Sequence, residues 1–398
     1  VNIIKPFLPY AAADKQGFML TQNSLGFNNL IYIASVLSDI KDCHVDDAVS
    51  IYALLIEEPE AHLHPQLQVN LYNFLKNADD SENSQTFITT HSPTLTSKIP
   101  LENLILLKDN AAFHVGDCFV NRHTENIVRD VSNHNRKLME DEVKSYRKMI
   151  ARYFDVTRSQ LLFSNGCLFI EGISECQLME TFSKLMGKSL IDNQIEIVDT
   201  DGTAFYQFLM LFNSSNDKVR LPMRAAFITD EDQFTDSKDK EYNLDALCAN
   251  DYAQLAVLRN GINVGSMNGR VNNMNAMANG QAGIKICSGV KTLEYQICKA
   301  NVFAEQEATK GTWLYELIMS ENEDGIGKVE AYINGLGERN LNDEEQQNVA
   351  LLLWKCLPGK AGFAQTLNTF LRDKIDAGGD VKFTVPSYIQ TAINHLVQ

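Results

Sequence analysis

The chain has 398 residues, 44% of them hydrophobic and 22% charged, which provides for two or three ordinary globular domains. It contains no apolar run of the roughly 18 residues that span a membrane, no signal-peptide pattern at its first residues and no C-x-x-C pair among its eight cysteines, so a soluble protein of a reducing cytoplasm without a zinc ribbon or disulfide framework is expected. The net charge of −16 argues against a broad nucleic-acid-binding surface, although carboxylates that gather divalent cations can still face a phosphate.

The first 110 residues alternate helical and strand patterns. An apolar stripe predicts a helix over 24–38, and an apolar strand is expected over 51–56. A second helix is expected near 66–77, and a short strand over 86–90 follows it. Buried strands that alternate with helices favour an α/β fold with a parallel sheet.

The remaining chain predicts a second α/β unit and a helical end. Residues 121–160 are rich in charged helix formers and predict a helical connector. Strands are then expected at 167–170, 195–198 and 225–229. The stretch 261–285 is rich in Gly, Asn and Met and suggests a long irregular loop. From about residue 301 helical patterning dominates, most clearly over the two segments 313–319 and 348–355.

Two carboxylates follow the first predicted strand. Glu57 and Glu58 stand at its end, where alternation directs their side chains to opposite sides. In a nucleotide hydrolase, one such carboxylate holds the Mg²⁺ shell and the other orients or deprotonates the attacking water. His91, at the end of the next strand, is placed to contact a γ-phosphate. Each feature alone is more typical of a solvated strand end or a structural histidine, so the prediction depends on their combination.

The combined pattern resembles the Walker B, D-loop and His-switch segments of ABC-type ATPases of the SMC and RecF kind. The resemblance rests on Leu-Leu-Ile-Glu-Glu-Pro-Glu-Ala-His-Leu-His-Pro at 54–65 and Thr-Thr-His-Ser-Pro at 89–93. The string Asn-Ser-Leu-Gly-Phe-Asn-Asn-Leu at 23–30 looks like the signature motif of the same ATPases. Within this pattern His62 and His64 are interpreted as structural residues rather than as a zinc pair.

This resemblance implies roles for five residues in an ATP site. Glu57 would support Mg²⁺, Glu58 would be the catalytic base and His91 would sense the γ-phosphate, whereas Ser24 and Gly26 would touch the nucleotide of a partner subunit. No G-x-x-x-x-G-K-[ST] phosphate loop occurs in the sequence. We therefore expect either that this loop lies in a preceding segment of a longer protein, which the start without Met favours, or that the ATP site is degenerate. The ATP site is incomplete in this chain, and little ATP hydrolysis by it alone is expected.

A second acidic pattern follows two later strands. Glu171 and Glu175 flank a turn and the start of a helix, where the i, i+4 relation lets both carboxylates face one site. Asp230 and Asp232 share a face if the chain stays extended after its strand. Four such carboxylates repel one another unless cations lie between them, and hard oxygen ligands suit Mg²⁺ or Mn²⁺. Two metals of this kind can activate a water and stabilise the leaving oxygen in phosphodiester cleavage.

In this order the two acidic motifs resemble the Toprim fold of type II topoisomerases, bacterial primases and recombination-mediator proteins. The string Ser-Gly-Val-Lys-Thr-Leu-Glu-Tyr at 288–295 resembles the Lys-Thr-Leu-Glu segment of OLD-family (overcoming-lysogenisation-defect) nucleases, and 153–163 resembles their connector between ATPase and nuclease. The resemblance covers about residues 20–300. It implies that the four carboxylates bind metal, that Lys291 stabilises charge on the phosphate and that Glu294 supports the site.

Alternatives stay open for single residues of this motif set. Taken alone, the two acidic motifs are equally typical of a helix N-terminus and a polar loop start. Glu231 lies inside the D-x-D pattern, which leaves open which acid binds metal. The turn at 199–202 offers a further carboxylate, although its sequence favours a simple turn. Without its neighbouring motif, Lys291 would be interpreted as a solvated surface lysine.

The sequence predicts an α/β protein of four segments: the C-terminal half of an ABC-type ATPase domain (1–120), a helical connector (121–165), a Toprim nuclease domain with a Rossmann-like parallel sheet (166–300) and a helical C-terminal region (301–398). The leading hypothesis is a metal-dependent DNA endonuclease or nickase, regulated by the ATPase, in anti-phage defence or DNA processing. The alternative is a non-catalytic, ATP-driven assembly or sensor scaffold, against which the intact acidic set argues. A topoisomerase would need a tyrosine nucleophile in a separate domain and a primase a template-binding module, and neither pattern is present.

The expected partners follow from the same resemblance. They are DNA, further copies of this chain in a homodimer or higher homo-oligomer, and a defence-system protein or nucleic acid, without a membrane. The expected cofactors are Mg²⁺ or Mn²⁺ and ATP.

Overall fold

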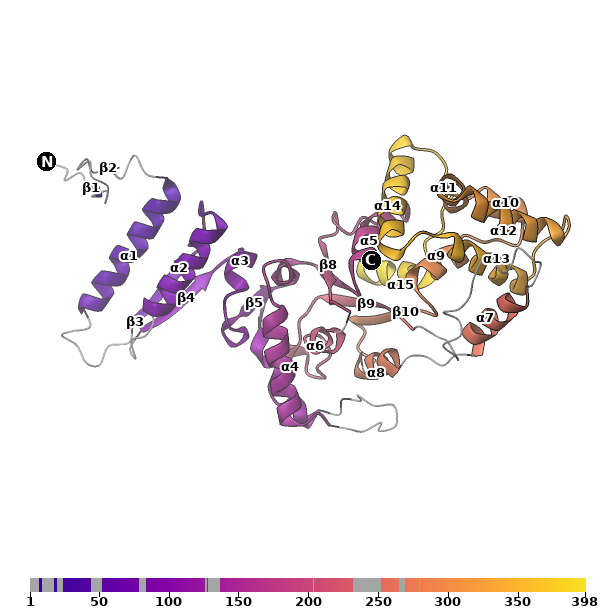
Figure 1. Cartoon of the computed structure of the whole chain (residues 1–398). Coiled ribbons are helices and arrows are strands. Elements are labelled where there is room, and N and C mark those ends of the chain that lie inside the picture. The colour runs from indigo at the N-terminus through magenta and orange to yellow at the C-terminus, as the bar shows by residue number, and fades with distance from the viewer. Residues whose placement is uncertain are drawn as a thin grey trace. The chain divides into compact units, whose positions relative to one another are not determined.

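The computed structural model describes residues 7–8, 18–19, 24–43, 52–78, 84–125, 127, 137–202, 204–231, 252–264, 269–278 and 280–398 (Figure 1). The chain divides into two compact units, Val1–Leu104 with Arg152–Phe163 and Ile105–Ala151 with Ser164–Gln398. None of the described helices is both long enough and apolar enough to cross a membrane. The cysteines at 118, 167, 176, 287, 298 and 356 are free thiols.

The first unit contains a two-stranded parallel sheet packed against two helices. Its elements are β1 (Phe7–Leu8), β2 (Phe18–Met19), α1 (Leu25–Cys43), β3 (Tyr52–Glu57), α2 (Pro65–Ala78), β4 (Ser84–Thr89), α3 (Pro93–Thr96) and the 3₁₀ helices Leu101–Asn103 and Arg158–Phe163. The predicted α/β order of this region is confirmed. The helix predicted over 24–38 continues to Cys43, and the other boundaries differ from the prediction by one or two residues.

Side-chain alternation gives β3 and β4 two different faces. Leu54 and Ile56 of β3 and Ile88 of β4 pack with apolar residues of α1 and α2. On the other face Leu55 and Phe87 lie directly opposite each other across the two strands, and they are 79% and 48% exposed. The described core of this unit therefore lies on one side of the sheet.

The second unit is built on a four-stranded parallel sheet of order β10-β9-β7-β8. Its elements up to residue 300 are β5 (Ile105–Lys108), β6 (Ala111–His114), the 3₁₀ helices Val115–Phe119, Arg122–Thr124 and Asp217–Val219, most of α4 (Glu140–Tyr153), β7 (Gly166–Ile170), α5 (Ile173–Leu185), β8 (Ile195–Asp199), α6 (Phe205–Leu209), β9 (Arg224–Asp230), α7 (Ala253–Val264), α8 (Gly269–Ala278), β10 (Ile284–Gly289) and α9 (Leu293–Ala300). Every residue of β7 is buried, as expected for a central strand covered on both faces. The three strands predicted for this unit are confirmed.

The two faces of this sheet are covered by different helices. Leu168, Ile228 and Cys287 point into a large apolar core shared with α5 and α9 and with the C-terminal helices. On the opposite face Phe169 stacks on Phe227 with ring centroids 4.5 Å apart, and the rings of α6 pack against this pair. Figure 1 shows α5 on one side of the sheet and α6 and α8 on the other.

The prediction of an irregular loop over 261–285 is wrong. The stretch contains the end of α7, the whole of α8 and the start of β10. Helix α8 forms because Val271, Met274 and Met277 recur at helical spacing and are buried, so their packing outweighs the low helix propensity of Gly269 and of the Asn residues between them.

The predicted helical region after 301 is confirmed. It consists of α10 (Gln306–Lys310), α11 (Trp313–Glu321), α12 (Glu323–Gly335), α13 (Asp343–Cys356), α14 (Lys360–Ala377) and α15 (Ser387–Leu396). These helices do not form a separate layer, because α14 packs on α5 and α15 packs on β7, β9 and β10. The end of the chain thus supplies part of the cover of the sheet.

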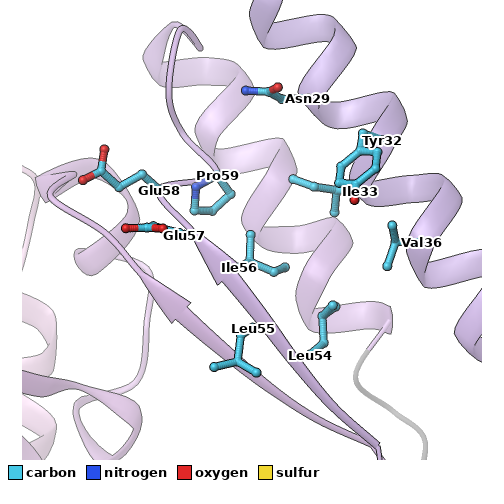
Figure 2. A pocket seen from close by; sticks show the side chains of 10 residues that line it. All are labelled: Asn29, Tyr32, Ile33, Val36, Leu54, Leu55, Ile56, Glu57, Glu58 and Pro59. Atoms are coloured by element: carbon cyan, nitrogen blue, oxygen red, sulfur yellow. The ribbon is translucent and has the colours of Figure 1, made fainter.

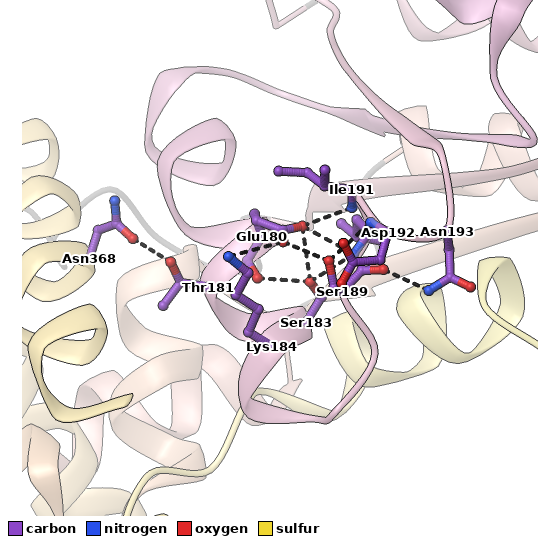
Figure 3. A network of polar contacts seen from close by, with 10 residues as sticks. Glu180, Thr181, Ser183, Lys184, Ser189, Ile191, Asp192, Asn193 and Asn368 are labelled. Carbon is purple, nitrogen blue, oxygen red and sulfur yellow. Dashed lines mark hydrogen bonds and ion pairs between the residues drawn. The ribbon is translucent and has the colours of Figure 1, made fainter. Parts of the chain in front are cut away.

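Helix α5 is fixed at its C-terminal end by a network of polar contacts (Figure 3). The Glu180 carboxylate accepts hydrogen bonds from the Ser189 hydroxyl at 3.0 Å and from the Leu190 and Ile191 backbone at 3.0 and 3.2 Å. The Thr181 hydroxyl donates to Asn368 of α14 at 2.5 Å. These bonds hold the helix in place, and with it the acidic residue in its first turn.

Candidate active site

The acidic residues predicted for metal binding stand where β7 and β9 end. Glu171 directly follows β7, Glu175 lies in the first turn of α5, and Asp230 is the last residue of β9. Because β7 and β9 are neighbouring parallel strands, their carboxyl ends meet at one edge of the sheet. Asp232 lies outside the described residues.

Glu171 is held by three donors. Its Oε1 accepts hydrogen bonds from the Asp230 backbone at 2.9 Å, from the Thr229 hydroxyl and from the Arg270 guanidinium. Arg270 comes from α8, donates also to Thr229 at 2.8 Å and to the Gly202 carbonyl at 3.2 Å, and lies over the Phe205 ring. The guanidinium is therefore the cation that balances Glu171 in this structure.

Asp230 points to the opposite face of the sheet from Thr229. Its Oδ2 accepts a hydrogen bond from the Leu293 backbone at 3.3 Å, at the N-terminus of α9, where the helix dipole favours a negative charge. Asp230, Glu175 and Glu294 are 8%, 9% and 5% exposed. Carboxylates so deeply buried need partners that water does not provide.

The segment between β10 and α9 carries the predicted lysine. Lys291 is 5% exposed, so the interpretation as a solvated surface residue is wrong. In the amide orientation that satisfies its neighbours, the Gln296 side-chain oxygen accepts hydrogen bonds from two backbone N–H groups, that of Val290 at 2.8 Å and that of Lys291 at 3.2 Å. The backbone that leads into the lysine is thus fixed by a side chain of α9.

Two further acidic features have structural roles. Glu231 donates its backbone N–H to the Gly289 carbonyl at 2.8 Å, and its carboxylate accepts from the Ser288 hydroxyl. The stretch 199–202 is a turn, as its sequence favours: Asp201 has φ 50° and the Gly202 N–H donates to the Glu171 carbonyl at 2.8 Å. This turn joins β8 to the acidic edge through the backbone.

The donor set fits a hard divalent cation by its chemistry. Glu171, Glu175 and Asp230 supply only carboxylate oxygens, which Mg²⁺ and Mn²⁺ prefer. In the part of the chain that the structure describes, no three His, Cys, Asp or Glu side chains lie close enough to hold one ion as they stand. One oxygen of Glu171 is turned to Arg270 instead. We expect that a cation bound by this set competes with the guanidinium for Glu171.

The predicted ATP-site carboxylates lie at the end of β3 in the first unit. Glu57 is the last residue of the strand, whereas Glu58 adopts a left-handed backbone with φ 42°. The Glu58 carboxylate lies 3.4 Å from Nε2 of His91, and both side chains are largely exposed. Figure 2 shows Glu57 and Glu58 at one end of a cavity of about 300 Å³ that is otherwise lined mainly by apolar residues of α1 and β3. The structure brings the Glu58 and His91 side chains together, and their roles at a nucleotide stay a prediction.

The predicted signature residues stand at the start of α1. Ser24 precedes the helix and accepts a long hydrogen bond of 3.4 Å from the Phe27 backbone. Gly26 is buried, and a Cβ at this position would lie 2.6 Å from the His62 carbonyl oxygen and 2.8 Å from Cδ2 of Leu63. A glycine is thus required here by the close approach of the helix to the turn after β3. The nucleotide contact predicted for Ser24 and Gly26 stays a prediction.

Two candidate functional residues, Arg270 and Glu60, were not identified from the sequence. Arg270 lies in a stretch that looked irregular, and only the burial spacing of α8 would have indicated that it projects from a helix. The carboxylate of Glu60 accepts from the Thr90 hydroxyl at 2.6 Å and from the His91 backbone at 3.0 Å, so Glu60 positions the histidine. The signal for Glu60 was present, since it lies inside the motif that contains Glu58.

Comparison with known proteins identifies two matching domain families. Residues 2–96 match an AAA ATPase domain, and residues 162–232 match the TOPRIM domain of proteins similar to the overcoming lysogenization defect protein. The endonuclease GajA of Bacillus cereus (strain HuB5-5) is 28% identical over 258 residues, which are 60% of this chain and 35% of GajA. The Old nuclease of Escherichia phage P2 is 26% identical over 69% of this chain and 44% of that protein. This chain spans between about a quarter and a half of the length of such curated relatives.

A solved structure is also similar. The C-terminal region of the Burkholderia pseudomallei OLD protein is 18% identical, with a TM-score of 0.31, and the match covers 59% of this chain and 97% of that one.

Proposed function

We propose that this chain, which joins an AAA ATPase domain to an OLD-like TOPRIM domain and is homologous to GajA and OLD nucleases, carries the cleavage site of a metal-dependent DNA endonuclease or nickase. The observation that carries the proposal is the meeting of Glu171, Glu175 and Asp230 at the carboxyl ends of two neighbouring parallel strands. Ligand sites in open α/β sheets lie at this edge. The relatives are named endonuclease and nuclease, which supports a nucleic acid as the substrate class, and we propose that it is DNA.

Each residue of the acidic edge has a proposed task. Glu171, Glu175 and Asp230, together with Asp232, would hold Mg²⁺ or Mn²⁺, which supplies Lewis-acid activation of water and of the leaving oxygen. Lys291 would stabilise charge that develops on the phosphate, because a buried ammonium acts strongly in a site that excludes water.

The remaining acid has a supporting task. Glu294, in the first turn of α9, would keep its carboxylate beside this set as a support. We propose that the ATPase half regulates the cleavage, with Glu57 at the Mg²⁺, Glu58 as base and His91 as γ-phosphate sensor. Ser24 and Gly26 would complete the nucleotide site of a partner copy.

The test is cleavage of supercoiled plasmid with Mg²⁺ or Mn²⁺, with and without EDTA. The variant Asp230→Asn keeps the size of the side chain and removes its charge, so cleavage should fall at least about 100-fold. The matched control is Asp373→Asn, the same change at an exposed position of α14. Equal cleavage by the Asp230→Asn variant would contradict the assignment of this edge as the nuclease site.

The biological setting separates the nuclease from a scaffold. Bacteria that express the protein would be challenged with phage, and the Asp230→Asn variant would be compared at equal protein level. A nuclease loses protection with this substitution, whereas an assembly scaffold keeps it. Parallel cleavage assays with ATP and with a non-hydrolysable analogue test regulation, since a nucleotide-controlled nuclease responds to one or both.

A further inference from the structure

Tyr388 in the last helix of the chain lies next to the acidic edge. It is 9% exposed, and its helix α15 packs against β7, β9 and β10. Nothing in the sequence motifs indicated a role for this helix. Its contacts place an aromatic residue from the end of the chain on the face of the sheet to which Asp230 points.

The register of β9 and β10 shows that Tyr388 lies close to Asp230. Gly289 is paired directly with Asp230 across β10 and β9, so the two residues share one face. A Cβ at position 289 would lie 3.2 Å from Cζ of Tyr388 and 3.3 Å from its Cε1. Cζ is the carbon that carries the hydroxyl. The glycine therefore makes room for the hydroxyl end of Tyr388 beside Asp230.

The hydroxyl itself is buried without a hydrogen bond to any described residue. Burial raises the pKa of Tyr388 well above its usual value, and the charges of Asp230, Glu175, Glu294 and Glu171 raise it further. The group is therefore a neutral hydrogen-bond donor surrounded by carboxylates. A buried donor without an acceptor destabilises the folded protein. The Tyr388 hydroxyl therefore indicates a second state of the site, in which one of the nearby carboxylates accepts its hydrogen bond.

A matching acceptor lies in the same set. Oε2 of Glu294 is also buried and has no hydrogen bond to a described residue. Glu171 and Asp230, in contrast, already accept hydrogen bonds from backbone N–H groups. The spare donor of α15 and the spare acceptor of α9 thus complement each other at one edge of the sheet.

We propose that Tyr388 is a positioning residue of the acidic site, whose hydroxyl donates a hydrogen bond to the Glu294 carboxylate when a divalent cation draws the acids together. The inference rests on the proposed metal-dependent function. A neutral donor behind the carboxylates directs their other oxygens toward the ion without competing for it. The C-terminal helix is thereby part of the metal site.

The test measures Mn²⁺ affinity by titration calorimetry in the absence of DNA, with the full chain and its Tyr388→Phe variant. This change keeps the ring against Gly289 and removes only the hydroxyl. We expect the Mn²⁺ affinity to fall about 10- to 100-fold, while the melting temperature in EDTA stays the same or rises because an unsatisfied donor is lost. Adding Tyr388→Phe to Glu294→Gln should then lower the Mn²⁺ affinity no further.

Tyr315→Phe is the matched control. Tyr315 is buried in α11, and its hydroxyl donates to Glu330 at 2.8 Å. This variant should melt at a lower temperature in EDTA and bind Mn²⁺ as the wild type does. The two tyrosine variants therefore have opposite expected effects.

Three results would overturn the inference. The first is an unchanged Mn²⁺ affinity in Tyr388→Phe, and the second is a loss of stability in EDTA as large as that of the control, which would assign the hydroxyl to the metal-free fold. The third is a wild-type protein that does not bind Mn²⁺ at this edge, which contradicts the metal site as a whole. A wild-type protein that binds Mn²⁺ but cleaves no DNA contradicts the nuclease proposal alone, because the affinity comparison still decides the role of Tyr388.

Discussion

Replacing Arg270 by Gln should make the protein less stable without metal and more responsive to it. The Arg270 and Glu171 side chains are 24% and 22% exposed, and the guanidinium donates to Glu171, Thr229 and Gly202. Breaking a fully buried pair costs about 3–5 kcal/mol, and partial exposure reduces this to about 2 kcal/mol. In a unit of this size that corresponds to a melting temperature about 4–8 °C lower in EDTA.

The same substitution should strengthen metal binding. We expect that in the wild type a cation displaces Arg270 from Glu171, whereas in the variant the carboxylate is available from the start. If the whole of the lost pair energy appears in binding, about 2 kcal/mol corresponds to an Mn²⁺ affinity up to about 30-fold higher. Saturating Mn²⁺ should then raise the melting temperature of the variant by more than that of the wild type, since a ligand stabilises in proportion to the logarithm of its concentration over Kd.

The assay is thermal unfolding in EDTA and over a series of Mn²⁺ concentrations. Arg259→Gln is the control, because Arg259 of α7 is another largely buried arginine. Its guanidinium contacts Glu344 at 3.2 Å and Asn348 at 3.1 Å. It should lose stability but keep the Mn²⁺ response of the wild type. An equal Mn²⁺ response in Arg270→Gln and the wild type would refute the idea that guanidinium and metal compete for Glu171.

Three further predictions concern packing and pH. Gly26→Ala should destabilise the first unit by about 1–3 kcal/mol in thermal unfolding, because its Cβ would meet the rigid His62 carbonyl at 2.6 Å, and an unchanged melting curve would contradict this. Gly289→Ala should displace the Gln296 side chain, which its Cβ would meet at 2.9 Å, and the Tyr388 ring, which it would meet at 3.2 Å, and thereby lower Mn²⁺ affinity in calorimetry as Tyr388→Phe does. Burial lowers the pKa of His395 below its usual 6.5, so the folded state binds this proton less readily than the unfolded state. The stability that neutral His395 contributes is therefore present above about pH 6.5 and lost as the pH falls below it, and melting temperatures of His395→Gln should fall less steeply with acid than those of the wild type.

The sequence predicts most strands of both units because buried parallel strands are apolar runs. β7 and β9 have this form, and the residues that follow them carry the acidic motifs. β10 was not predicted, since it contains Lys285 and follows a stretch rich in Gly and Asn. The Lys291 motif that comes directly after β10 was nevertheless found, because it depends on a resemblance and not on periodicity.

The contacts that complete the candidate site could not be predicted from apolar runs or from motifs. Arg270 meets Glu171 from 99 positions further along the chain, and Tyr388 meets the same edge from still further away. Neither residue has a local pattern that ties it to an acidic site. Their positions follow from how α8 and α15 pack on opposite faces of the sheet, which is a tertiary property. The predicted domain boundary at 300 stays a prediction for the same reason.

The placement of α15 determines where the second unit can be truncated. The segment that matches the TOPRIM family, 162–232, contains three of the four strands of the sheet but neither β10 nor the helix that covers it. A fragment that ends after Glu294 would keep all the acidic residues of the second motif set and Lys291, yet it would leave an apolar sheet face open to water. We therefore expect the shortest autonomous folding unit of this half to reach to the end of α15, with borders set by burial and not by the distribution of its motifs.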